Sequence, residues 1–229
     1  MGARRGERAI SGLPALYARA QGKSRALSDR AEVQTRFRQA IESVTAIVSE
    51  DLVVPLKLTA GDEVQGLIES PHVVVDIVTH VTEALVPVRI SWGLGFGDLA
   101  TELMEDVALL DGPCLQRARE AVELAKKKSN SLEVRGLDAP MGELLSAIMN
   151  LIGAIRSSWT PKQARAVIAT RGTSQAAAAK SLGIDPSTIS RTLSAAHYKP
   201  VLEGEAAARA LLRTPVSYTH LRAHETKAN

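Results

Sequence analysis

The segment from Gln175 to Ser194 constrains the fold of this chain more than any other. A small residue, Ala179, precedes Gly183 by four positions, and glycine supplies a turn because it reaches positive φ without the steric cost of a Cβ. The apolar residues on both sides of this turn are Leu182, Ile184, Ile189 and Leu193. Their spacing packs a second helix onto the first. The segment therefore predicts a helix-turn-helix.

Capping residues agree with this prediction. Residues 160–163 have the spacing of a capping box, in which the first and fourth side chains satisfy each other's backbone N–H groups. Either Thr173 or Ser174 caps the first helix of the motif, and either Asp185 or Ser187 caps the second. The motif is thus expected within an all-α domain over residues 160–212.

The second helix of such a motif enters the DNA major groove with its N-terminal residues nearest the base edges. We expect Arg191 to read a base, helped by Ser187 and Ser190, while Lys180 and the backbone near 173–175 hold phosphates. The full predicted DNA-binding set is Thr173, Ser174, Gln175, Lys180, Ser187, Thr188, Ser190, Arg191 and Ser194. Residues 160–200 carry six Lys or Arg against one acid, the surplus that phosphate neutralisation requires. A helical bundle that only resembles a DNA reader, or a module that contacts protein, is the alternative.

Composition limits the fold and function classes that the whole chain can belong to. Its 229 residues allow one or two domains, and 45% hydrophobic but only 3% aromatic residues predict an aliphatic core. No apolar run has the length of a membrane span. The single cysteine excludes an internal disulfide framework and fits a reducing cytoplasm. The net charge of +3 is too small to indicate nucleic-acid binding by itself.

Both ends are unusual. Residues 1–27 are rich in Arg, Ala and Gly without clear alternation, and read equally as a flexible basic leader or as a start-site or reading-frame error. The run 216–226 resembles the translation of a transposon-type sequencing-library adapter. We therefore interpret 215–229 as an artefactual tail and exclude it from reasoning about fold and function.

Residues 28–136 read as a helix, a hairpin, a helix, a strand, a helix and a short further strand. This order predicts an α+β domain: a ferredoxin-like antiparallel sheet with helices on one face. Its opening strand is not recognisable and would fall within the leader. The glycine-rich run 93–97 lacks the spacing and βαβ context of a dinucleotide loop, so we assign it to strand packing. Residues 137–159 form an apolar connecting helix, expected to be buried between domains or in a dimer.

Several motifs of this domain resemble the SatD family of bacterial proteins. They are Ser24-Arg25 with Asp29-Arg30, Gly61-Asp62-Glu63-Val64-Gln65-Gly66-Leu67, Gly93-Leu94-Gly95-Phe96-Gly97, and Asp111-Gly112-Pro113 followed by Arg117-Ala118-Arg119-Glu120. The resemblance covers about residues 24–212. It implies an N-terminal domain of this kind followed by a C-terminal helix-turn-helix. Members carry a Gly-Asp strand just before the Ser-Arg pair, where this chain has Gln21-Gly22-Lys23.

Asp62 and Glu63 lie in the hairpin turn, which resembles the acidic hairpin of palm-type nucleotidyl cyclases. Such carboxylates bind Mg²⁺ and a nucleoside triphosphate, provided that further oxygens converge on the ions. The sequence shows no opening strand that carries such a carboxylate, and either Asp98 or Asp111 could supply the further oxygen ligand instead. A hairpin turn that simply favours Gly and Asp is the alternative.

Two functions follow. The first is a DNA-binding transcriptional regulator whose N-terminal domain senses a nucleotide or small-molecule effector or forms a homodimer, with double-stranded DNA as its partner and no resident cofactor. The second is a nucleotide-binding or cyclase-like enzyme with an appended DNA-binding module.

Overall fold

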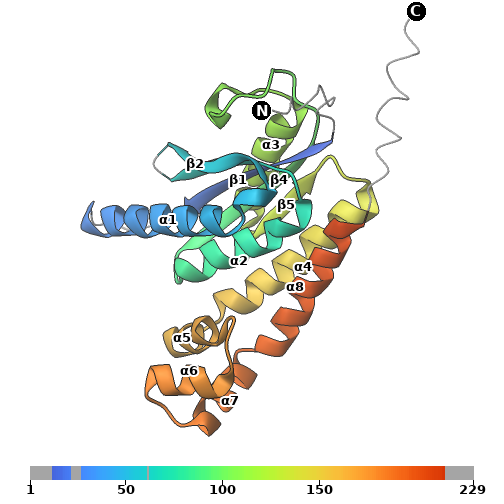
Figure 1. The fold of residues 1–229 in the computed structure, drawn as a ribbon. Coiled ribbons are helices and arrows are strands. Elements are labelled where there is room, and N and C mark those ends of the chain that lie inside the picture. The colour runs from blue at the N-terminus through green and yellow to red at the C-terminus, as the bar shows by residue number, and fades with distance from the viewer. Residues whose placement is uncertain (1–11, 22–26, 61, 215–229) are drawn as a thin grey trace, which may run out of the picture.

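The computed structural model describes residues 12–21, 27–60 and 62–214 (Figure 1). The strands are β1 (Leu13–Gln21), β2 (Leu52–Ala60), β3 (Glu63–Ile68), β4 (Arg89–Gly97) and β5 (Leu132–Arg135). The α-helices are α1 (Leu27–Ile47), α2 (Val74–Ala84), α3 (Pro113–Lys128), α4 (Ala139–Ser157), α5 (Pro161–Thr170), α6 (Gln175–Leu182), α7 (Pro186–Ala195) and α8 (Tyr198–Arg213). Single-turn 3₁₀ helices lie at Ser49–Asp51, Pro71–Val73 and Val107–Leu109. Most of the leader, the Ser24-Arg25 pair and the 215–229 tail lie outside the described residues.

The strands form one sheet in the order β2-β3-β1-β4-β5. Strand β1 is antiparallel to both β3 and β4, and β2 is antiparallel to β3. At the other edge β5 runs parallel to β4, after a crossover through α3. The chain is therefore α+β as predicted, but its sheet is mixed. The prediction of a purely antiparallel sheet is wrong because the last strand returns through a helix rather than a hairpin.

An opening strand is present, contrary to the sequence prediction. Strand β1 lies at the centre of the sheet, inside the segment interpreted as a leader. Leu16 and Ala18 are buried in the core on one face, whereas Ala15 and Tyr17 are buried in the core on the other. A strand that is covered on both faces lacks the alternation of polar and apolar residues by which half-buried strands are recognised.

Helices cover both faces of the sheet, so the prediction that they lie on one face is also wrong. Helices α1 and α2 pack on the first face through residues such as Phe37, Ile41 and Val78. Helix α3 packs on the second face through Ala118 and Val122. Figure 1 shows the sheet edge-on between these layers. The result is a three-layer α/β/α unit with two hydrophobic cores.

The glycine-rich run of β4 allows α3 to approach the sheet closely. A Cβ on Gly93 would lie 2.2 Å from the Ala118 carbonyl oxygen, and a Cβ on Gly95 would lie 2.2 Å from the Ala118 amide nitrogen. Between these glycines Leu94 points to the opposite core. The assignment of this run to strand packing is confirmed.

Helix α4 connects the sheet to the C-terminal helices. It packs on β5 and lies beside α8, while α5, α6 and α7 form a lobe at the end of the molecule away from the sheet (Figure 1). Leu145, Met149 and Ile152 are buried along α4, but Leu144 and Leu151 are 53% and 68% exposed. One face of this apolar helix is therefore uncovered within a single chain. No helix in the part of the chain that the structure describes has the length and apolar character needed to span a bilayer.

Candidate functional site

The turn between α6 and α7 is built by the residues that the sequence predicted. Ser174 caps α6, because its Oγ accepts a hydrogen bond from the Ala177 amide at 3.2 Å. Gly183 ends α6 in the left-handed region, with φ of 64°. Asp185 caps α7 by accepting from the Ser187 amide at 2.7 Å. Thus Ser174 rather than Thr173, and Asp185 rather than Ser187, supplies each cap.

Side chains at this corner fix the angle between the two helices. Ala178 and Ala179 are buried at the crossing, where only small side chains fit. Ile189 and Leu193 are buried on the inner face of α7. The pKa of Asp185 is held below its usual value because the side chain and backbone of Ser187 donate hydrogen bonds to its carboxylate. The cap is therefore ionised at neutral pH, which suits a helix N-terminus.

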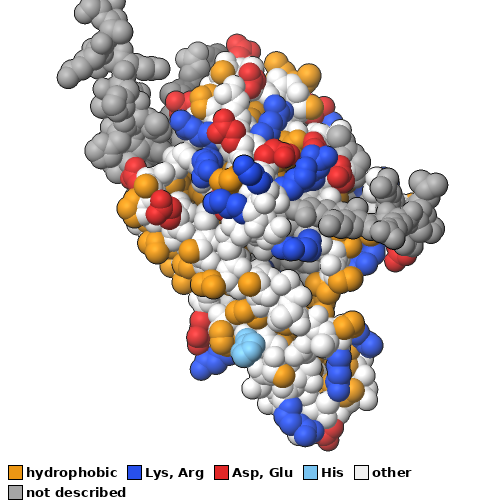
Figure 2. All heavy atoms as spheres, turned by 180° about the vertical axis from the view of Figure 1, so that it is seen from behind, with side chains coloured by type: hydrophobic (Ala, Val, Ile, Leu, Met, Phe, Trp, Pro, Cys, Tyr) orange, Lys and Arg blue, Asp and Glu red, His pale blue; other side chains and the backbone are white. Residues whose placement is uncertain are grey.

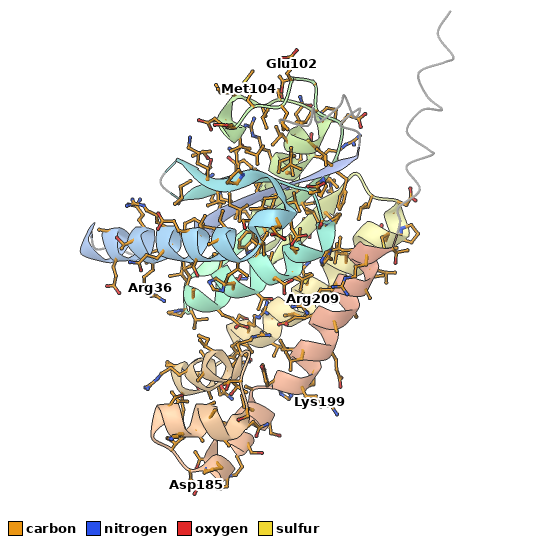
Figure 3. The ribbon with its side chains drawn as sticks, in the orientation of Figure 1. Arg36, Glu102, Met104, Asp185, Lys199 and Arg209 are labelled. Atoms are coloured by element: carbon orange, nitrogen blue, oxygen red, sulfur yellow. The ribbon has the colours of Figure 1, made fainter. Side chains whose placement is uncertain are left out.

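The outer face of α6 and α7 is polar and open to solvent. Of the nine residues predicted to contact DNA, all are exposed except Thr188, which is half-buried. Arg191 lies on this outer face, where its Nε donates to the Ser187 carbonyl oxygen at 3.3 Å. Asp185 lies at the far tip of the lobe (Figure 3). Figure 2 shows Lys and Arg side chains spread over the same lobe, with little acidic surface.

The start of α6 borders an open hollow of about 720 Å³. The residues that line it include Thr173, Ser174, Gln175 and Tyr198. The guanidinium of Arg171 lies 5.5 Å from the centre of the Tyr198 ring. The structure therefore brings the three residues predicted to hold a phosphate together at one helix N-terminus, beside a cation.

That cation, Arg171, is already engaged by the protein. It was counted among the charges available for phosphate, but its Nε donates to Glu83 at 3.0 Å and its Nη1 to Glu205 at 2.9 Å. Arg156 shares both acids, donating to Glu205 at 2.6 Å and lying 3.3 Å from Glu83. We call these four residues the buried ion cluster. Counting Arg171 as a free cation was wrong, since a charge count does not reveal an internal partner.

The buried ion cluster joins four elements. Glu83 belongs to α2, Arg156 to α4 and Glu205 to α8, while Arg171 follows the end of α5. The side chains of Glu83, Arg156 and Glu205 are at most 6% exposed. A further ion pair lies beside the cluster, where Arg209 of α8 donates to Asp76 of α2 at 2.7 Å (Figure 3). The cluster thus fixes the lobe of α5–α7 to the sheet-bearing part of the chain.

In the buried ion cluster, burial and ion pairing shift the pKa values of the side chains in opposite directions. Burial alone would raise the pKa of Glu205, but the hydrogen bond from Arg171 and the charges of Arg171, Arg156 and Arg209 together outweigh it, so this pKa lies below its usual value. Burial would lower the pKa of Arg171, which its hydrogen bonds to Glu205 and Glu83 raise instead. Burial does hold the pKa of Arg156 below its usual value, against the charges of both acids. Each charge therefore depends on its partners.

No sequence pattern predicted this cluster. Its members are separated by up to 122 positions in the chain, and no local periodicity links them. A signal was present nonetheless. Arg156 interrupts the row of apolar residues on the buried face of α4, and Glu83 does so on the buried face of α2. A lone charge on the buried face of a helix requires a partner.

The acidic hairpin is also engaged by other residues. Arg19 of β1 lies 3.5 Å from the Asp62 carboxylate and 3.3 Å from the Glu63 carboxylate. Tyr17 donates to Glu63 at 2.5 Å, and burial together with this hydrogen bond raises the pKa of Tyr17 to about 12. The residues that the structure describes contain no group of three His, Cys, Asp or Glu side chains able to hold a metal ion.

Asp98 and Asp111 lie too far from the acidic hairpin to complete a metal site there. Strand pairing aligns Arg19 with Glu63 at one end of β1, and Leu13 with Gly97 at the other. Asp98 follows Gly97, so it lies about 20 Å from the hairpin turn at about 3.3 Å per strand residue. Asp111 is also at the far end, because its carbonyl accepts from the Ala100 amide at 2.9 Å. The carboxylates of Asp62 and Glu63 instead share Arg19 with Glu123 of α3, which lies 3.5 Å from it, and Mg²⁺ binding there stays a prediction.

Comparison with known proteins adds the family. No curated protein and no solved structure matches the chain. The family model described as SatD family matches residues 21–212. This match begins at the last residue of β1 and ends one residue before the end of α8, and so includes strands β2 to β5, the buried ion cluster and the α6–α7 corner. The chain belongs to the SatD family.

Proposed function

We propose that the protein is a double-stranded DNA-binding transcriptional regulator of the bacterial cytoplasm, and that α5–α7 act as a helix-turn-helix domain. One observation carries this proposal: α7 presents Ser187, Ser190 and Arg191 to solvent while its inner face is braced on α6. Arginine reads guanine through two hydrogen bonds, and serine contacts either bases or phosphates. We assign Arg191 to base reading.

The charge of the lobe supports the same function. With Arg171 engaged, the exposed cations are Lys162, Arg165, Lys180, Arg191 and Lys199. Helix N-termini bind phosphate because their first N–H groups have no partner within the helix. The start of α6, with Thr173, Ser174 and Gln175 beside the open hollow, suits such a contact. Phosphates would hold the lobe in register while α7 reads the groove.

The sheet-bearing part would serve as the sensor or dimerisation module. The sequence of elements from β1 to β4 and their order in the sheet support a ferredoxin-like arrangement, with β5 added at the edge. Dimerisation is supported by α4. Its only charged residues are Glu143 and Arg156, and Arg156 is buried, so the exposed stripe of Leu144 and Leu151 has almost no charge along it. Two copies of such a stripe complement each other, and a dimer would read two half-sites.

The test is the affinity for a labelled duplex selected from a randomised pool, measured by fluorescence anisotropy at increasing salt. If about four cations contact phosphates, affinity falls roughly a hundredfold between about 50 and about 200 mM salt. Lys180→Gln should reduce the dependence on salt. Lys127→Gln removes the same charge from α3 and should not. A complex insensitive to salt would contradict the proposal and favour a protein-binding adaptor.

A further inference from the structure

A cavity of about 480 Å³ lies where the sheet-bearing part meets the C-terminal helices. Its walls come from the end of α2, the connection 86–90, the loop 129–131, the second half of α4, and Trp159. The volume falls within the range of about 300–1,000 Å³ that is typical of small-molecule sites. Exposed residues at its rim, among them Arg89 and Ser157, leave it open to solvent.

The lining of the cavity combines an apolar wall with unmatched positive charge. Val86, Pro87 and Val88 form part of the apolar wall. Two arginines line the cavity, and none of the described lining residues is a carboxylate. Arg156 is balanced by the buried ion cluster, whereas Arg89 donates to the Ser129 carbonyl oxygen at 2.6 Å and has no carboxylate partner among the described residues. Within the described part of the chain, the charge in this cavity that has no acidic partner is therefore that of Arg89.

Asn150 supplies a neutral donor to the same cavity. Its Oδ1 accepts from the amides of Ser131 and Leu132 at 2.8 and 2.9 Å, which fixes the orientation of the side chain. Among the described residues, none accepts a hydrogen bond from its Nδ2. A fixed amide donor and a guanidinium that line one cavity with an apolar wall are suited to an anionic group attached to an apolar body.

We propose that this cavity binds a small organic anion with an apolar body, whose acidic group faces Arg89 and Asn150, and that the anion regulates DNA binding. The regulatory consequence rests on the function proposed above. Trp159 lines the cavity and donates its Nε1–H to the Ala196 carbonyl oxygen at 2.8 Å, at the C-terminal end of α7. Arg156 lines the same cavity and, through Glu205, contacts Arg171 beside the start of α6. An occupant thus contacts residues that hold both helices of the DNA-reading corner.

Binding is tested with anilinonaphthalene sulfonate, an aromatic anion that fluoresces when it is desolvated. The full chain should show one saturable site. Arg89→Gln, which removes the anion's charged partner, should weaken binding about tenfold. Ser157→Phe fills the cavity and should also weaken binding, whereas Ser158→Phe changes the neighbouring exposed serine, which does not line the cavity, and should leave binding unchanged. Circular dichroism checks that each variant folds. Absence of a saturable site, or equal binding by all variants, overturns the proposal.

Regulation is tested by repeating the duplex titration with the site saturated. The affinity for DNA should change several-fold, and linkage requires the affinity for the probe to change by the same factor when DNA is bound. Trp159→Phe lacks the indole N–H and should reduce this coupling while leaving a measurable probe site. Unchanged DNA affinity in wild type overturns the regulatory role. If no DNA binds under any condition, the proposed function is wrong. The binding of the probe to the variants still shows whether the cavity is an anion site.

Discussion

Glu205 offers the most direct test of the buried ion cluster. Its side chain is fully buried, and its carboxylate accepts from Arg156 at 2.6 Å and from Arg171 at 2.7 and 2.9 Å. The substitution Glu205→Gln keeps the size of the side chain and one acceptor oxygen but removes the charge. Two guanidiniums would then share Glu83 alone. Breaking a buried ion pair on one side costs about 3–5 kcal/mol, and we expect a loss near the lower bound, about 3 kcal/mol.

The control is Glu203→Gln, two positions earlier on α8. Glu203 lies 3.8 Å from Lys199, with side chains 67% and 88% exposed. An exposed pair of this kind contributes at most about 0.5 kcal/mol. Both variants change the same charge on the same helix, so the difference between them measures burial and pairing. The assay is urea unfolding followed by circular dichroism, with the free energy of unfolding extrapolated to water.

A double-mutant cycle with Arg171→Gln then separates the energy of the Glu205–Arg171 interaction from the other destabilising effects of each substitution. Residues of one ion network couple by about 0.5–3 kcal/mol. A loss below about 1 kcal/mol for Glu205→Gln, within the range of an ordinary substitution, would refute the claim that this cluster holds the lobe to the sheet. Additive losses in the cycle would refute the pairing itself.

Three further perturbations test other parts of the fold. Gly95→Ala should destabilise the protein by about 1–3 kcal/mol in urea unfolding, because the new Cβ meets the α3 backbone; a neutral result would contradict that close packing. The folded-state pKa of Glu205 is lowered, so its contribution to stability is present above the unfolded-state value of about 4.3 and is lost as pH falls through the folded value. Hence the difference in unfolding free energy between wild type and Glu205→Gln should shrink below about pH 4, and a difference independent of pH would contradict the assigned shift. Leu151→Glu should convert a dimer to a monomer in analytical ultracentrifugation, while Leu109→Glu, at another exposed leucine, should not; a monomeric wild type would end the dimer proposal.

Local patterns predicted the C-terminal elements well. The capping box at Thr160, the turn at Gly183 and the cap at Asp185 each depend on residues within a few positions of one another. Such features are determined by backbone geometry and short-range hydrogen bonds, which a sequence displays directly. The outward position of Arg191 follows from the same helical period.

Features that depend on distant residues were missed. Strand β1 was predicted to be absent because Ala15 to Ala18 are buried on both faces and show no alternation. Because β1 was not predicted, Arg19, which pairs with the acidic hairpin, was missed as well. The partners of Arg156 come from α2 and α8, and only the assembled fold brings them together. Long-range pairing therefore determines the partners of the acidic hairpin and of Arg171, and neither could be predicted from local sequence patterns.

Whether α7 reads DNA bases is decided by the sequence specificity of an Arg191→Ala variant. The measurement is the ratio of dissociation constants for a scrambled duplex and the selected duplex, at one fixed salt concentration. Loss of a base-reading arginine should reduce this ratio roughly 5- to 150-fold, which corresponds to about 1–3 kcal/mol of binding free energy. Lys180→Gln should weaken both duplexes alike and leave the ratio unchanged. An Arg191→Ala variant that weakens both duplexes equally, or neither, would contradict the account.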